Sequence, residues 1–125
     1  MEELKVYKCE ICGNIVVKLK DRSEALACCG EAMVLIDPKA KDGAGEKHVP
    51  VVSVEGDLVK VQVGEVLHPM EESHFIEFII VQYEDGFDIK FLKPGMEPKA
   101  EFKTNKEVKA VYEFCNLHGL WKVEI

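Results

Sequence analysis

The sequence contains two groups of side chains whose donor atoms suit transition metals. Four of the five cysteines occur in the first 30 residues, whereas the fifth cysteine and all four histidines follow position 47. Clustered cysteines in an odd total indicate metal or redox chemistry more than a disulfide framework. The sequence is therefore divided by ligand type into a sulfur-rich head and a histidine-rich body. In chain order, the two sets are Cys9, Cys12, Cys28 and Cys29, and then His48, His68, His74, Cys115 and His118.

The four head cysteines form two pairs, as expected for a tetrahedral thiolate site. The spacing of Cys9 and Cys12 lets one turn bring both sulfurs to the same ion, and Gly13 and Gly30, which follow the two pairs, suit tight turns. The second pair consists of adjacent cysteines, which cannot both form a relaxed turn, so we expect a distorted tetrahedron. Zinc and iron both accept four thiolates, and the donor set alone leaves both open.

Five donors in the body exceed the four that close a structural zinc site. His68 and His74 flank a short loop, Cys115 and His118 lie at the end of an expected strand, and His48 opens another. Because a β-sandwich gathers its loops at two ends, these donors could converge at one of them. Four imidazoles in a plane with an axial thiolate would leave a sixth position open, as in a thiolate-ligated haem, and iron is then the expected metal.

The head, residues 1–36, is too short to be stabilised by hydrophobic burial alone, because chains below about 40 residues usually need a metal, disulfides or a partner. Its apolar residues suit short strands around a metal. Residues 37–47 contain a proline, two glycines and alternating charges without helix or strand periodicity, so they are predicted to form a loop. We therefore predict a small metal-binding domain over 1–36 and a second domain over 37–125.

The body is predicted to be a seven-stranded immunoglobulin-like β-sandwich, which makes the whole chain all-β. Leu58–Val63 alternates apolar and polar residues, and His74–Tyr83 is apolar on both faces, as in a central strand. Asp85 and Gly86 indicate a hairpin, and Trp121 is expected to pack in the core near the ligand turn. The other strands are expected at His48–Val54, Phe87–Leu92, Lys99–Lys103, Glu107–Phe114 and Leu120–Ile125.

Bulk composition limits the classes of partner. The chain has 125 residues, 47% of them hydrophobic, and a net charge of −7, which argues against binding to nucleic-acid phosphates. No apolar run approaches the roughly 20 residues needed to span a bilayer, so no membrane association is expected. The first residues are partly acidic and lack the apolar segment of a signal peptide, which favours the cytoplasm.

Three body segments and the head motif together resemble the desulfoferrodoxins, which are two-iron superoxide reductases. The head, with Cys9-x-x-Cys12 and Cys28-Cys29, is similar to the desulforedoxin module of that family. The resemblance covers essentially the whole chain. The body segments are Glu46-Lys47-His48-Val49-Pro50, His68-Pro69-Met70 with His74, and Cys115-Asn116-Leu117-His118-Gly119-Leu120-Trp121.

The resemblance implies the reduction of superoxide to hydrogen peroxide with a rubredoxin-like external electron donor, and a homodimer. It also implies two iron ions per chain, one bound by the four head cysteines. Lys47 is expected to attract superoxide, and Glu46 to close onto the oxidised iron after the product leaves. The implied ligands of the second iron are one axial thiolate and four imidazoles in a plane, namely Cys115, His48, His68, His74 and His118.

Three other functions remain open on the sequence alone. A non-catalytic electron carrier would do its redox work in the head, but it would gain nothing from an open position in the body site. A zinc-stapled binding module would be colourless, whereas a ferric tetrathiolate is red. A superoxide dismutase would act without an external reductant, which distinguishes it from a reductase.

Overall fold

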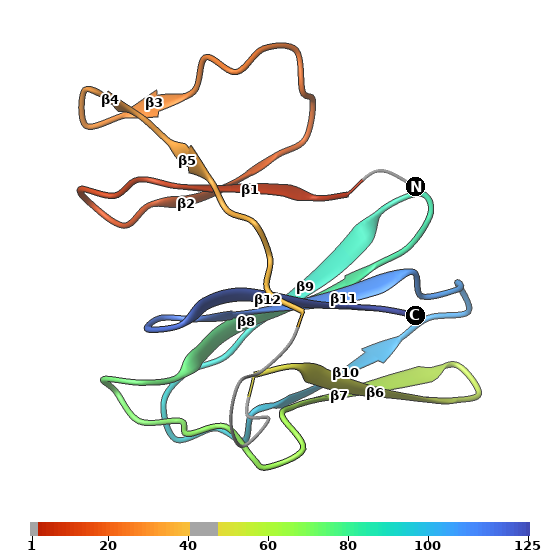
Figure 1. Ribbon diagram of the computed structural model, residues 1–125. Helices are drawn as coiled ribbons and strands as arrows, with labels where there is room; N and C mark the ends of the chain where they lie inside the picture. The colour runs from red at the N-terminus through yellow and green to blue at the C-terminus, as the bar shows by residue number, and fades with distance from the viewer. Residues whose placement is uncertain (1–2, 41–47) are drawn as a thin grey trace. The chain divides into compact units, whose positions relative to one another are not determined.

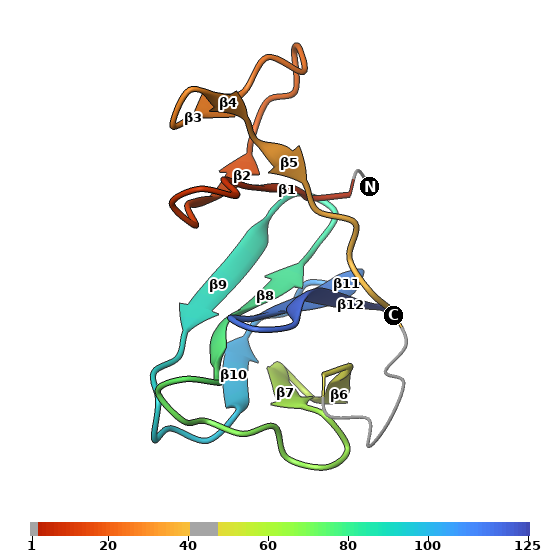
Figure 2. The same cartoon turned by 60° about the vertical axis from the view of Figure 1, so that its left-hand side comes forward.

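The computed structural model describes residues 3–40 and 48–125. Glu46 and Lys47, the two predicted catalytic residues, therefore lie outside the described residues. The chain divides into two compact units, one ending at Asp37 and the other beginning at Pro38. Every regular element within the described ranges is a strand (Figures 1 and 2), which confirms the all-β prediction. Among those residues there is no helix long and apolar enough to cross a bilayer.

The head is built from short strands around the cysteines. β1 lies between β2 and β5 in an antiparallel sheet, and β3 and β4 form a separate hairpin. Its buried cluster consists of Tyr7, Cys9 and Met33, which is small even with the buried Val6 beside it in β1. A core of this size contributes little, so a domain of this length needs a further source of stability such as a metal cross-link. The strands are β1 (Lys5–Lys8), β2 (Ile15–Lys18), β3 (Ala27–Cys28), β4 (Glu31–Ala32) and β5 (Val34–Leu35).

The body is a sandwich of two antiparallel sheets, seen as two layers in Figure 1. One sheet has the strand order β10-β7-β6 and the other the order β12-β11-β8-β9. The seven strands confirm the predicted sandwich. They are β6 (Pro50–Glu55), β7 (Leu58–Val63), β8 (Ile76–Gln82), β9 (Phe87–Phe91), β10 (Lys99–Lys103), β11 (Ala110–Cys115) and β12 (Gly119–Glu124).

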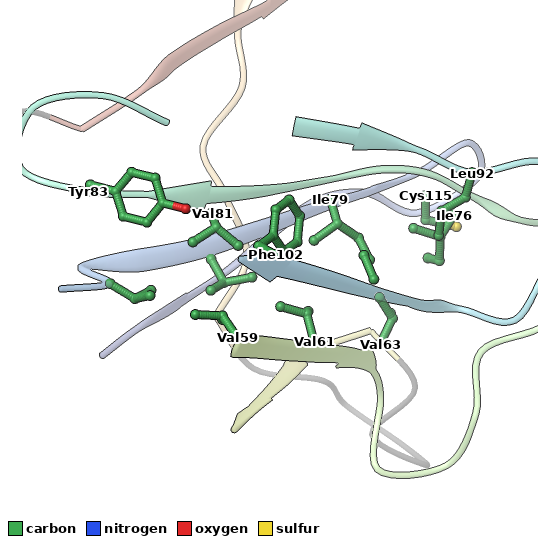
Figure 3. Close-up of a cluster of buried hydrophobic side chains, with 13 residues drawn as sticks. Val59, Val61, Val63, Ile76, Ile79, Val81, Tyr83, Leu92, Phe102 and Cys115 are labelled. Carbon is green, nitrogen blue, oxygen red and sulfur yellow. The ribbon is translucent and has the colours of Figure 1, made fainter. Parts of the chain in front are cut away.

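The core of the body lies between the two sheets. The side chains of Val59, Val61 and Val63 all leave the same face of β7 and point toward β8 (Figure 3), as the alternation of this strand predicts. β8 itself is paired on both edges and largely buried, which agrees with its prediction as a central strand. Cys115 belongs to the same buried cluster and lies beside Ile76 (Figure 3), so one end of the core carries a candidate metal ligand.

Some strand ends differ from the prediction near the histidines. β6 begins two residues after His48, and β8 begins two residues after His74, so both histidines lie in the preceding loops. The prediction of an unstructured loop is wrong at Lys39, which forms a parallel bridge with Trp121 on β12. The backbone groups of Lys39 bond to both neighbours of Trp121, at 2.9 and 2.8 Å. Ile125, the last residue of the strand expected at Leu120–Ile125, lies just beyond β12 and is 63% exposed.

Candidate metal centres

The structure brings the four histidines and Cys115 together at one end of the sandwich, with all candidate ligand atoms within 4.8 Å of one another. Four pairs of ring centroids lie at nearly equal distances of 4.6 to 4.9 Å, and these pairs close a circuit through the four rings. The centroids of His48 and His74, which are not neighbours in that circuit, are 6.4 Å apart. Four similar sides and a longer diagonal describe a square of imidazoles.

Strand ends and tight loops position these side chains. His68 and His74 lie in the connection between β7 and β8, where Glu71 and His74 exchange two backbone hydrogen bonds of 2.9 and 3.0 Å. Cys115 is the last residue of β11, next to an irregularity in the pairing with β8. His118 lies in the turn that follows, and Gly119 ends this turn with a φ of 82°, a conformation that favours glycine.

Asn116 joins the cysteine turn to the histidine loop. Its side-chain oxygen accepts a hydrogen bond from the Phe75 amide at 2.9 Å, and its side-chain nitrogen donates to the Ser73 carbonyl at 3.1 Å. Its own amide donates to the Phe75 carbonyl at 3.2 Å. These three bonds hold Cys115 and His74 in register. In the sequence, the only signal for this role of Asn116 is its place between two expected ligands, Cys115 and His118.

His68 is prepared for metal binding by its own surroundings. It is 2% exposed, and its Nδ1 donates to the Pro69 carbonyl at 2.7 Å, which leaves Nε2 with the free electron pair. Nε2 is buried and has no hydrogen-bond partner among the described residues. Burial lowers the pKa of His68 to about 4, so the imidazole is neutral at pH 7. A buried, neutral nitrogen without a proton donor fits a metal ligand.

The distance between two neighbouring rings also fits a shared ion. His48 Nε2 and His118 Nδ1 are 2.9 Å apart. Two nitrogens bound at right angles to one metal, each at roughly 2.1 Å, would be separated by about 3 Å. Trp121 supports this pair, because its ring stacks on His48 at 4.6 Å and 12°. Trp121 is 6% exposed, so it packs in the core as predicted and also lines the site.

Cys115 supplies the only sulfur of the body site. Burial raises the pKa of its thiol, whereas the backbone amides of His118 and Leu117 donate to the sulfur and oppose that rise. Its Sγ lies 3.9 Å from His118 Nδ1. A coordinated metal cation deprotonates a thiol directly, so the raised pKa of the free thiol does not prevent ligation.

The head cysteines form the second candidate centre, again with all four sulfurs within 4.8 Å. The Cys12 amide donates to the Cys9 sulfur and lowers the pKa of Cys9 to about 6, while the Cys12 thiol raises the pKa of Cys29 to about 12. Four such thiolates repel one another unless a cation is shared among them, so this donor set fits a metal. Asn14 Nδ2 donates to the Cys28 sulfur at 3.5 Å.

The backbone of the head follows the expected turns. Gly13 and Gly30 have φ values of 82° and 77°, which agrees with their prediction as turn residues. Cys29 has a φ of 54°, which is unfavourable for a residue with a Cβ atom. The strain at Cys29 is the local consequence of placing two adjacent cysteines on one site.

Comparisons with known proteins agree with both centres. The family model described as desulfoferrodoxin matches residues 40–124, and the one described as desulfoferrodoxin, N-terminal domain, matches residues 1–36. The chain is 48% identical over 121 residues to a desulfoferrodoxin homolog of Archaeoglobus fulgidus, which covers 97% of each chain. The chain belongs to the desulfoferrodoxin family. This membership confirms the resemblance seen in the sequence.

Further relatives of this desulfoferrodoxin-family chain carry the name superoxide reductase. A protein of that name from Pyrococcus abyssi is 42% identical over 106 residues, covering 70% of this chain and 92% of its own. The crystal structure of the superoxide reductase from Treponema pallidum superposes with a TM-score of 0.80 at 33% identity, covering 98% of both chains. The two candidate centres of this family member are consistent with two iron ions per chain.

Proposed function

We propose that this chain is a superoxide reductase, which converts superoxide, one electron and two protons into hydrogen peroxide. The observation that carries the proposal is the square of four imidazoles with one buried cysteine sulfur, all within 4.8 Å. Five donors at one point leave one position of an octahedral ion for a small ligand. The relatives named superoxide reductase support the same activity.

Iron bound in the body site would supply the single electron that superoxide takes up. The histidines and Cys115 would hold it, and because these donors carry little negative charge they would leave the centre positive enough to attract an anionic substrate. The pKa of His68 is low, so that ring contributes no charge at pH 7, and among the five donors only the cysteine is anionic when it binds a metal. A divalent cation in this site keeps a net positive charge, which attracts superoxide despite the chain's net charge of −7.

We assign Lys47 and Glu46 the catalytic roles that the family resemblance implies. Both precede His48 in the sequence. The Lys47 ammonium would attract superoxide and order a water that donates a proton. The Glu46 carboxylate would occupy the open position in the oxidised enzyme after hydrogen peroxide leaves.

We further propose the assembly and setting of the enzyme. The domains span 1–36 and 37–125, and the head iron is a distorted Fe(Cys)4 centre. Each turnover consumes one electron, so an external donor is required, and a rubredoxin-like protein suits a one-electron step. A homodimer follows from the family resemblance and is tested by light scattering. None of the five cysteines forms a disulfide, a state that the reducing cytoplasm maintains, and cell fractionation tests that location.

The test is a stoichiometric reaction of the fully reduced protein with superoxide. Iron analysis should give two irons per chain, and the oxidised protein should be red. Each superoxide consumed should yield one hydrogen peroxide, with oxidation of the body iron and no release of dioxygen. Dioxygen release without a reductant would indicate a dismutase. Absence of reaction would indicate an electron carrier, and a colourless protein with zinc in the head and no body metal would indicate a binding module.

A further inference from the structure

Lys39 lies against the body site, although the sequence places it in a charged linker. Its Nζ donates to the carbonyl oxygen of His118 at 3.1 Å. The same ammonium lies 5.2 Å from the centroid of the Trp121 ring, which stacks on His48. One cation therefore contacts the main chain of one candidate ligand and the ring that supports another.

The backbone fixes Lys39 at this place. Its amide donates to the Leu120 carbonyl at 2.9 Å, and its carbonyl accepts from the Lys122 amide at 2.8 Å. This parallel bridge extends the edge of β12 directly after the ligand turn. Because its amide and its carbonyl are both hydrogen-bonded, the Cα atom of Lys39 has a fixed position beside Trp121. The strand pairing thus places the Lys39 side chain within reach of the His118 carbonyl.

The carbonyl of His118 links Lys39 to the cysteine sulfur. It accepts from Lys39 and also from Trp121 Nε1, at 3.2 Å. In the same turn the amides of Leu117 and His118 donate to the Cys115 sulfur. The side chains of Lys39 and Trp121 thus hold the carbonyl end of this short turn, and the amides of the turn face the Cys115 sulfur. A few atoms of main chain therefore connect the contact of Lys39 to the contacts of the sulfur.

We propose that Lys39 is a positioning residue for the body centre, which holds the Cys115–His118 turn and adds a fixed positive charge that favours the reduced form of a bound metal. This inference rests on the proposed iron centre. Removal of the charge favours the more positive, oxidised metal. For a charge roughly 12 Å from the metal and an effective dielectric of about 20 to 40, Coulomb's law predicts that the equilibrium constant for reduction falls by roughly three- to tenfold, and tenfold corresponds to about 59 mV for one electron.

The experiment compares full-length, iron-loaded wild type with Lys39→Met, Lys39→Arg and the control Lys103→Met. The Lys103 side chain is 81% exposed, and its residue pairs with Leu58 at the start of β7, roughly 17 Å along the strand from the end that leads to His68. The readouts are the midpoint potential of the body iron and its thiolate charge-transfer absorption. Lys39→Met should lower the potential and shift the band, while Lys39→Arg and Lys103→Met stay near wild type.

Two results would overturn the proposal. One is a Lys39→Met potential equal to that of Lys103→Met, and the other is a Lys39→Arg potential shifted as far as that of Lys39→Met. Iron content and thermal unfolding of each variant identify any loss of folding, and Lys39→Gln replaces Lys39→Met if that variant does not fold. The wild-type protein could form hydrogen peroxide while the Lys39 variants have the same midpoint potential as wild type. That combination would leave the proposed function intact and reject only this inference.

Discussion

The side chain of His68 illustrates how single residues are prepared for chemistry in this fold. Its Nδ1 is committed to the Pro69 carbonyl, and burial keeps the ring neutral, so Nε2 is the only nitrogen available to a metal. The residue type and spacing suggested a ligand, but the choice of nitrogen depends on a carbonyl whose position only the folded chain defines. The same applies to Asn116, whose three bonds tie two ligand loops together.

The first prediction at this scale concerns the charge of Lys47. A lysine ammonium about 6 Å from superoxide gains roughly 0.7 kcal/mol in water and about 3 kcal/mol at an effective dielectric near 20. Lys47→Ala should therefore slow the second-order reaction with superoxide by roughly 3- to 100-fold, and Lys47→Arg much less. The rate constants are measured at several ionic strengths, and the alanine variant should show a weaker salt dependence. Equal rates and equal salt slopes would reject the role.

Another prediction at the residue scale concerns acid stability of the head. The Lys18 ammonium, 2.8 Å away, and Lys5 lower the pKa of Asp21 from 3.8 to about 2. A depressed carboxyl pKa stabilises the folded head at all pH values above about 4, and this contribution is lost as the pH falls toward 2. The carboxyl carbon shift of Asp21 should stay that of an ionised group at pH 3.5. Lys18→Met should raise the pKa, whereas Lys103→Met should leave it unchanged.

Among the elements, the strands were predicted better than the segments that connect them. The alternation of apolar and polar residues predicted a strand at Leu58–Val63, which are the observed bounds of β7. The apolar run around Ile79 predicted the central strand β8. The bridge of Lys39 to β12 gave no sequence signal, because a single charged residue in a polar linker has no periodicity, and its pairing depends on an edge formed by distant residues. The five donors were identified from residue type, but their square follows from loop geometry.

The turn between β11 and β12 carries the prediction for this scale. Gly119 has a φ of 82°, and an added Cβ would meet no atom within 4 Å, so Gly119→Ala should cost only backbone strain, about 1–2 kcal/mol. Because His118 precedes it, the variant should also retain less body iron. Thermal unfolding and iron analysis test this. Gly86→Ala is the matched control, since its space is equally open and its φ is not in the left-handed region. Equal effects of the two substitutions would contradict the explanation.

At the level of the whole molecule, the chain combines two units with different sources of stability. The body has a continuous core between two sheets, whereas the head buries only a small cluster around Cys9. The sequence predicted this division from length and ligand type, since a segment of this size cannot bury enough apolar surface alone. The two candidate centres share no residue, so each can lose its metal separately.

This separation leads to a prediction for Cys12→Ser. The substitution removes one head sulfur, so the red colour of the head should be lost, and the head should become sensitive to protease because its small cluster cannot replace the metal. The rate constant of the reduced body centre with superoxide should stay within about twofold of wild type, because the two centres share no ligand residue and independent sites contribute additively. Pulse radiolysis of the reduced variant, with one body iron confirmed by analysis, provides the measurement.

Cys115→Ser is the reciprocal control for this experiment. It removes the only sulfur of the body site, so it should abolish hydrogen peroxide formation while the head keeps its iron and colour. If Cys12→Ser abolished superoxide oxidation of a fully loaded, reduced body iron, the head would be part of the reactive path. The double variant Cys12→Ser, Cys115→Ser should show neither the red colour nor the reaction with superoxide, as expected if the two losses are additive. Independent losses in the two single variants would mean that the body alone reacts with superoxide, and would limit the head iron to a role in the delivery of electrons.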